Sequence, residues 1–178
     1  MISVSFPAVI VMISLLWILV RVAVRKKTGQ FSVRREAELL LVYICLIVVA
    51  RFTLFAMETV NGKVQPLRFD PTFGAAWDIN WKALCFLAAY EHLWEMKVNI
   101  IGNIAMFIPI GVIWPAVFRQ LDTHKKVIAA GVGFSLFIEI IQLPLHGRVT
   151  DVDDLILNSL GYLIGYGIYL LVKKLKKK

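Results

Sequence analysis

The sequence contains few of the residues that build metal centres and thiol chemistry. Its 178 residues include two cysteines and three histidines. Cys45 and Cys85 have neither metal-site spacing nor a CxxC motif, so we interpret both as small apolar side chains unless the fold pairs them as a disulfide. His146 has no second histidine as a partner, which argues against a zinc site.

The sequence also lacks a basic helix face and any basic motif interleaved with aromatic residues. The net charge is +8 and the pI is about 9.7, but the basic residues form short clusters between apolar runs. This distribution is typical of membrane topology and argues against nucleic-acid binding. There is no internal repeat, no soluble domain and no low-complexity tract other than the lysine-rich end.

Apolar residues are abundant instead. They make up 59% of the chain, and the mean hydropathy is +0.74, which is typical of membrane proteins. We expect one all-α transmembrane domain over residues 1–178, a polytopic bundle of about five helices, with the first run retained rather than cleaved as a signal peptide. The predicted spans are Val4–Val20, Glu38–Phe55, Asn99–Val117, Val127–Leu143 and Leu155–Val172.

The basic residues predict the orientation of these spans. They gather in the first connection, in the third connection and in the tail, whereas the other two connections are neutral or acidic near their helices. The positive-inside rule therefore places the N-terminus outside and the C-terminus in the cytoplasm. The residues concerned are Arg21, Arg25, Lys26, Lys27, Arg34, Arg35, Arg119, Lys125, Lys126, Lys173, Lys174, Lys176, Lys177 and Lys178.

The long connection over residues 56–98 contains two distinct stretches. The stretch Trp81–Trp94 has apolar residues at helical spacing and a tryptophan at each end, so it predicts a helix at the outer membrane interface. An ordinary amphipathic helix packed on the bundle is the alternative. The preceding stretch VQPLRFDPTFG contains two prolines and a glycine and predicts an extended loop rather than a strand or helix.

Polar residues inside the predicted spans lie near the outer ends of these spans. Arg51 and Glu139 lie about 12 or 13 residues from the inner start of their helices and thus at a similar depth. Asn99 and Asn103 share one face of the third span. Because charges in hydrocarbon face a cavity or a partner, we expect an outward-opening polar pocket in which Arg51 is the counter-ion of Glu139. A purely structural ion pair of Glu139 with Arg51 or Arg148 is the alternative.

The fifth span carries a polar stripe at helical spacing. Its members follow one another by three or four residues: Asp151, Asp154, Asn158, Gly161 and Gly165. The two glycines form a GxxxG motif, which we interpret as a helix-packing site. Ser135, Glu139 and Gln142 share a face of the fourth span and belong to the same predicted pocket. Asp151 or Asp153 also suits a second role, that of helix N-cap.

Three blocks of this sequence resemble the VanZ-like family of bacterial membrane proteins. NIIGNIAMFIPIG (99–111) has an Asn-rich helix entry and F-x-P-x-G, SLFIEIIQ (135–142) has S-x-x-x-E-x-x-Q, and RVTDVDDLILNSLG (148–161) has D-x-x-D-x-x-x-N-x-x-G. The resemblance implies a plasma-membrane protein with a family core over about residues 38–172. It also implies ligand-binding residues, to which we add Arg51: Asn99, Asn103, Glu139, Gln142, Arg148, Asp151, Asp154 and Asn158.

The resemblance further implies a link to low-level resistance to teicoplanin, a lipoglycopeptide that binds the D-Ala–D-Ala end of cell-wall precursors. The first hypothesis is a bilayer protein that binds teicoplanin or a lipid-linked peptidoglycan precursor in the outer pocket, without a cofactor. The second is a membrane enzyme that acts on a lipid or undecaprenyl-linked headgroup, with Glu139 and Asp154 as the acid/base pair and a divalent cation as an option. Catalysis stays open, although the sequence shows no activated serine or cysteine. A transporter is disfavoured, because the polar groups gather at one side.

Overall fold

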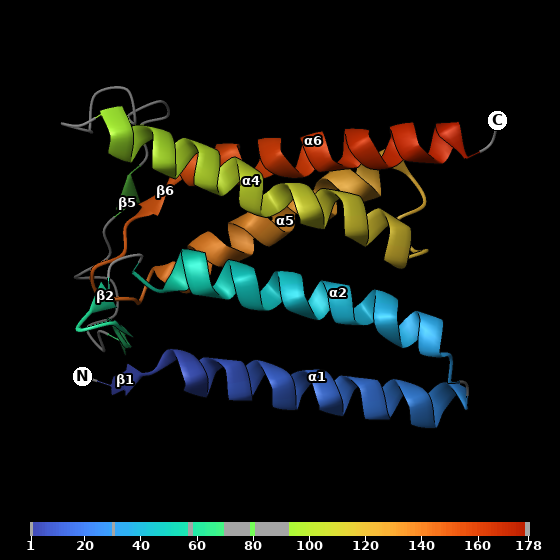
Figure 1. The fold of residues 1–178 in the computed structure, drawn as a ribbon, viewed down its shortest axis with the longest axis horizontal. Helices are drawn as coiled ribbons and strands as arrows, with labels where there is room; N and C mark the ends of the chain where they lie inside the picture. The colour runs from blue at the N-terminus through green and yellow to red at the C-terminus, as the bar shows by residue number, and fades with distance from the viewer. Residues whose placement is uncertain (1, 30, 57–58, 70–78, 81–92, 177–178) are drawn as a thin grey trace. The chain divides into compact units, whose positions relative to one another are not determined.

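The computed structural model describes the chain except for residues 1, 30, 57–58, 70–78, 81–92 and 177–178 (Figure 1). The protein is 74% helical, and its described part contains five α-helices, which confirms the predicted all-α helix bundle. Two compact units divide the chain, Met1–Thr72 (unit 1) and Phe73–Lys178 (unit 2). The single domain over residues 1–178 stays a prediction.

Unit 1 is built on two helices. Helix α1 covers Phe6–Thr28, and α2 covers Val33–Val49 and continues into the π-helical turn η1, Ala50–Leu54. The Ser5 side chain caps α1 by accepting a hydrogen bond from an amide of its first turn. The helix ends only at Gly29, which has a φ of 64°. The helix extends eight residues beyond the predicted span Val4–Val20, because a basic run ends an apolar pattern but does not end a helix.

Short strands complete unit 1. Antiparallel pairs form between β1 and β4 and between β2 and β3, which are joined by a tight turn at residues 61–62. The strands are β1 (Ile2–Val4), β2 (Thr59–Val60), β3 (Lys63–Val64) and β4 (Leu67–Phe69). The prediction of a strand-free loop is therefore wrong for β4. Backbone pairing with β1, from the other end of the unit, overrides the local effect of the prolines, and it buries Leu67.

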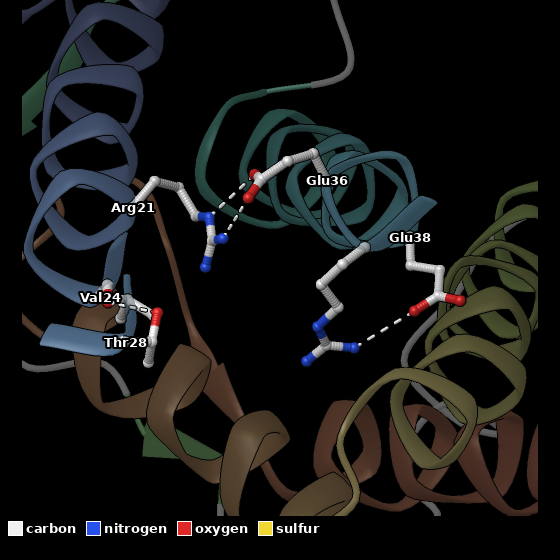
Figure 2. Close-up of polar contacts among 6 residues, drawn as sticks. Arg21, Val24, Thr28, Glu36 and Glu38 are labelled. Carbon is white, nitrogen blue, oxygen red and sulfur yellow. Dashed lines mark hydrogen bonds and ion pairs between the residues drawn. The ribbon is translucent and has the colours of Figure 1, made fainter. Parts of the chain in front are cut away.

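Polar contacts join α1 to α2 at two levels. Figure 2 shows the Arg21 guanidinium facing the Glu36 carboxylate, to which its Nε donates at 3.0 Å and its Nη2 donates as well. Further along, the Ser14 and Tyr43 hydroxyl groups are 2.7 Å apart, and the Trp17 ring packs against that of Tyr43. These contacts align two helices that otherwise expose large apolar side chains.

Because Arg21 donates two hydrogen bonds to the Glu36 carboxylate, Arg21→Gln is expected to destabilise unit 1. Charge-assisted hydrogen bonds contribute about 1.5–3 kcal/mol to the free energy of unfolding. Solvent screens this partly exposed pair, so the expected loss is roughly 1–2 kcal/mol. The matched control is Arg34→Gln, because the Arg34 side chain is 88% exposed and pairs with Glu38 on its own helix. Reversible unfolding in mixed micelles measures both variants, and equal losses of unfolding free energy would contradict the assigned role.

The described part of unit 2 contains three helices and one pair of very short strands. Strand β5 runs parallel to β6, immediately ahead of α6. In Figure 1, α4, α5 and α6 form one layered group within this unit. The elements are β5 (Ile79–Asn80), α4 (Leu93–Val117), α5 (His124–Gln142), β6 (Thr150–Asp151) and α6 (Val152–Leu175).

Helices α4 and α6 pack backbone against backbone. A Cβ atom added at Gly161 would overlap the carbonyl oxygen of Ile104, and one added at Gly165 would overlap that of Ile108. Gly111 of α4 in turn leaves room for the carbonyl of Tyr162. Residue numbers rise together along both helices, so the pair is parallel. The packing interpretation of the GxxxG motif is confirmed.

Helix α5 runs antiparallel to α6 along most of its length. At its start, His124 Nδ1 lies 2.8 Å from the Tyr166 hydroxyl oxygen. Near its end, a Glu139 carboxylate oxygen accepts the backbone N–H of Asp151 at 3.1 Å. The 15 residues between Tyr166 and Asp151 correspond to about 22 Å of helix. Helix α5 therefore lies beside the first two-thirds of α6, whose last nine residues extend beyond it.

Four described helical segments are long and apolar enough to cross a membrane, namely Phe6–Thr28, Val33–Leu54, Met96–Val117 and Val152–Leu175. Helix α5 is not among them, because its 19 residues include Lys125, Lys126 and Glu139. Four of the five predicted spans therefore have the length and apolar composition that a membrane-crossing helix needs. The fifth helix lies antiparallel beside α6, with its carboxylate buried.

The predicted interfacial helix falls almost entirely outside the described residues. Residues 81–92 are not described, and α4 already begins at Leu93. Trp94, the last residue of the predicted stretch, is 74% exposed. The interfacial helix stays a prediction.

Candidate polar ligand site at one end of unit 2

The N-terminal half of α4 and the first turn of α6 meet through one amide. The Asn103 side-chain nitrogen donates to the Asn99 side-chain oxygen at 2.7 Å and to the Asp154 carboxylate at 2.6 Å. An amide nitrogen carries two hydrogens, so both are used. The parallel packing of α4 and α6 brings these residues to the same level, as the two sequence stripes predicted.

Asp151 joins three parts of the chain at the start of α6. One carboxylate oxygen accepts the N–H of Asp153 at 2.8 Å, which makes Asp151 the N-cap. The other oxygen accepts the side-chain amide of Asn80 at 3.1 Å, from β5. Its own backbone N–H donates to Glu139. Of the two predicted caps Asp151 is correct, and Asp153 lies buried in the first turn.

The connection from α5 to α6 is a compact turn. The Leu145 N–H donates to the Gln142 carbonyl at 2.9 Å, and the Arg148 N–H donates to the Leu145 carbonyl at 3.2 Å. Gly147 has a φ of 76°, a conformation that glycine adopts without strain. The Thr150 hydroxyl then donates to the Glu139 carbonyl at 3.1 Å. The turn therefore brings the chain back over the end of α5 and holds Arg148 beside it.

Several charges act on one another in this small volume. The carboxylates of Asp151 and Asp154 repel a negative charge on Glu139. The Arg148 guanidinium attracts the negative charge on Asp154. Glu139 is 4% exposed. A buried carboxylate with like-charged neighbours is costly unless it is paired, and such groups in membrane helices usually belong to functional sites. We call the seven residues at this end the polar cluster: Asn80, Asn99, Asn103, Glu139, Arg148, Asp151 and Asp154.

Further polar side chains are buried between the helices. Ser135, Gln142 and Asn158 are buried, whereas their neighbours Leu136 and Ile140 are exposed, so the predicted polar face of α5 points inward. Among the described residues, the Ser135 hydroxyl and the Asn158 side-chain oxygen have no hydrogen-bond partner. Unsatisfied buried polar atoms are unfavourable and are typical of functional interiors.

The structure thus assembles eight of the nine predicted site residues in unit 2: six in the polar cluster, and Gln142 and Asn158 in the interior. Arg51 lies in unit 1, where its guanidinium donates to the Ala56 carbonyl at 3.1 Å and lies 5.9 Å from the Phe6 ring centroid. Its pairing with Glu139 stays a prediction.

The sequence did not predict two residues that contribute hydrogen bonds to this site, Asn80 and Thr150. Asn80 precedes α4 in a region without periodicity, and Thr150 lies between two motif residues. Only the D-x-x-D block next to Thr150 was a usable signal.

Among the residues that the structure describes, no group of three or more His, Cys, Asp or Glu side chains is arranged to hold a metal ion.

These features define a multi-pass membrane protein with a cluster of polar and charged groups at one end of three packed helices. The family model VanZ/LLP1 matches residues 39–173, and the chain belongs to this family. Comparison with curated proteins and with solved structures finds no match. The matched region agrees with the predicted core over about residues 38–172 and leaves α1 and the end of the lysine tail outside.

Proposed function

We propose that this VanZ/LLP1 protein binds an amphiphilic molecule of the bacterial cell envelope at the polar cluster. The ligand class is a lipoglycopeptide such as teicoplanin or a lipid-linked cell-wall precursor. The supporting observation is the concentration of buried and half-buried carboxylates and amides at one end of helices whose exposed side chains are apolar, such as Phe137, Ile140, Ile156 and Leu160. An amphiphile complements both the polar cluster and the apolar helix surface, because its polar head can lie at the cluster while its tail lies in the lipid.

The orientation of this binding site follows from charge distribution. In unit 2, the basic clusters of α5 and α6 lie at the helix ends opposite the polar cluster. The positive-inside rule then places the cluster at the outer face of the plasma membrane and the C-terminus in the cytoplasm. The alternating directions of α4, α5 and α6 support this assignment, and counting α5 as a fifth span beside the four long apolar helices places the N-terminus outside.

Arg148 and the asparagines are the groups suited to contact a ligand head. A guanidinium forms paired hydrogen bonds with a carboxylate or phosphate, both of which occur in these molecules. Glu139 has a different role, because its carboxylate and its carbonyl hold β6 and the turn beneath Arg148. Replacing Glu139 is therefore expected to disturb the cluster through its geometry as well as its charge.

Susceptibility testing in a teicoplanin-sensitive Gram-positive host examines the proposal. Wild type is expected to raise the inhibitory concentration of teicoplanin but not that of vancomycin, which lacks the acyl chain. Glu139→Gln and Asn158→Ala are expected to fall to the empty-vector value, whereas the exposed Asp122→Asn, which also removes one carboxylate, keeps full protection. Immunoblots of membranes must show equal abundance. Protection that persists in both the Glu139→Gln and the Asn158→Ala variant would refute the proposal.

A second candidate is an enzyme acting on a lipid headgroup, favoured by the presence of the Glu139 and Asp154 carboxyl groups in one polar cluster, where Glu139 accepts the Asp151 N–H and Asp154 accepts the Asn103 amide. Two coupled carboxyl groups can serve as acid and base. Incubation of the purified protein with a labelled undecaprenyl-linked headgroup separates the two candidates. Stoichiometric thermal stabilisation without product supports binding, whereas turnover that Glu139→Gln abolishes supports the enzyme.

A further inference from the structure

The end of unit 2 opposite the polar cluster is strongly basic. Here α4 ends at Val117, α5 begins at His124 and α6 ends at Leu175. The segments 112–132 and 160–178 contain eight lysines and arginines and a single acidic residue, Asp122. The charge therefore belongs to a defined end of the unit and not to one helix alone.

Aromatic contacts join the start of α5 to the end of α6. Tyr166 binds His124 through its hydroxyl group at 2.8 Å and stacks on Tyr169, with ring centroids 6.2 Å apart and an interplanar angle of 17°. The Lys173 ammonium lies 5.6 Å from the Tyr169 ring centroid. The residues His124, Tyr166, Tyr169 and Lys173 thus form a continuous chain of contacts in which Tyr166 is buried, and Lys125 beside it is exposed.

Little of this positive charge is neutralised within the protein. Asp122 accepts a hydrogen bond from Lys126 at 2.8 Å, and this bond holds the pKa of Asp122 below its usual value. The pair is highly exposed, and it offsets one ammonium. In the part of the chain that the structure describes, Lys125, Lys174 and Lys176 have no carboxylate partner.

We propose that this basic end, made of Lys125, Lys126, Lys173, Lys174 and Lys176 with Tyr169, binds anionic phospholipid headgroups. Its position at the ends of apolar helices puts the ammonium groups where lipid phosphates lie. Exposed lysines beside an anionic leaflet each add a favourable electrostatic contribution. Tyrosine prefers this interfacial level, because its ring is apolar and its hydroxyl is polar.

Native mass spectrometry of the purified full chain in a neutral detergent tests this proposal. Phosphatidylglycerol is titrated against phosphatidylcholine, and inorganic phosphate is added as a competitor in a separate series. Phosphatidylglycerol is expected to bind roughly tenfold more tightly than phosphatidylcholine, and binding is expected to weaken with added salt. Millimolar phosphate is expected to leave lipid binding unchanged, because the lipid also binds through its tails.

Matched triple variants separate this surface from the net charge of the chain. Lys125→Gln/Lys173→Gln/Lys174→Gln is expected to weaken phosphatidylglycerol binding roughly tenfold or more. The control Lys63→Gln/Arg68→Gln/Lys97→Gln removes the same charge from exposed side chains of the connection predicted to lie outside and is expected to keep most of the affinity. Equal losses in the two variants, equal binding of both lipids, or displacement by inorganic phosphate would each overturn the proposal. The teicoplanin test concerns the opposite end of α6, so its outcome is independent.

Discussion

Gly161→Ala is expected to destabilise unit 2 by about 1–3 kcal/mol, although it adds only one methyl group. That methyl group would overlap the backbone carbonyl oxygen of Ile104, which cannot move aside as a side chain does. Relief requires α4 and α6 to separate, and this separation would also strain the bond between Asn103 and Asp154. The sign of the effect is informative, because alanine normally favours a helix by about 1 kcal/mol over glycine.

The control for Gly161→Ala lies on the same helix. Gly167 is exposed, and no atom lies within 4 Å of the position that an added methyl group would occupy, so Gly167→Ala is expected to be neutral or slightly stabilising. Thermal unfolding in detergent and the monodispersity of the purified protein measure both variants. If the two variants unfold at the same temperature, the close backbone packing of α4 on α6 is not a determinant of stability.

Asn103→Leu is expected to have the second large effect, about 1–3 kcal/mol of unfolding free energy. The variant removes both hydrogen bonds of one amide and leaves the half-buried Asp154 carboxylate without that donor. Losing a partner of a buried charged group is more costly than losing both partners together, because the remaining group still pays for its desolvation.

A double-mutant cycle tests this account of Asn103. Asp154→Leu in the Asn103→Leu background is expected to cost less than in wild type, with a coupling energy of about 1 kcal/mol or more. Reversible unfolding of the four proteins in mixed micelles supplies the measurement. Additive losses would show that the 2.6 Å contact between Asn103 and Asp154 contributes no net stability.

The parts of the site that the sequence predicted correctly depend on local periodicity. Asn99 and Asn103 are one turn apart, and Asp154, Asn158, Gly161 and Gly165 follow the same helix face, so their common orientation follows from helical geometry. The N-cap at Asp151 is similarly local, because a carboxylate directly before a helix accepts amide hydrogens of its first turn.

The parts that the sequence did not predict depend on distant contacts. Asn80 and Asp151 are separated by 71 residues, and no periodic pattern marks the short parallel pair of β5 and β6. Depth alone proposed Arg51 as the counter-ion of Glu139, and because Arg51 lies in unit 1 this pairing stays a prediction. The observed partner of Glu139 is a backbone N–H, a donor that every non-proline residue carries and that no motif distinguishes.

The dependence of Glu139 on the Asp151 amide also bears on how the protein is made. A ribosome delivers α4 and α5 to the membrane before α6 exists, so the carboxylate of Glu139 and the amide of Asn103 enter without their partners from α6. A lone charge at that depth is costly, which favours holding α5 at the insertion machinery until α6 emerges. Chains truncated before residue 150 are therefore expected to insert α5 poorly, and the last helix completes the insertion of the helix before it.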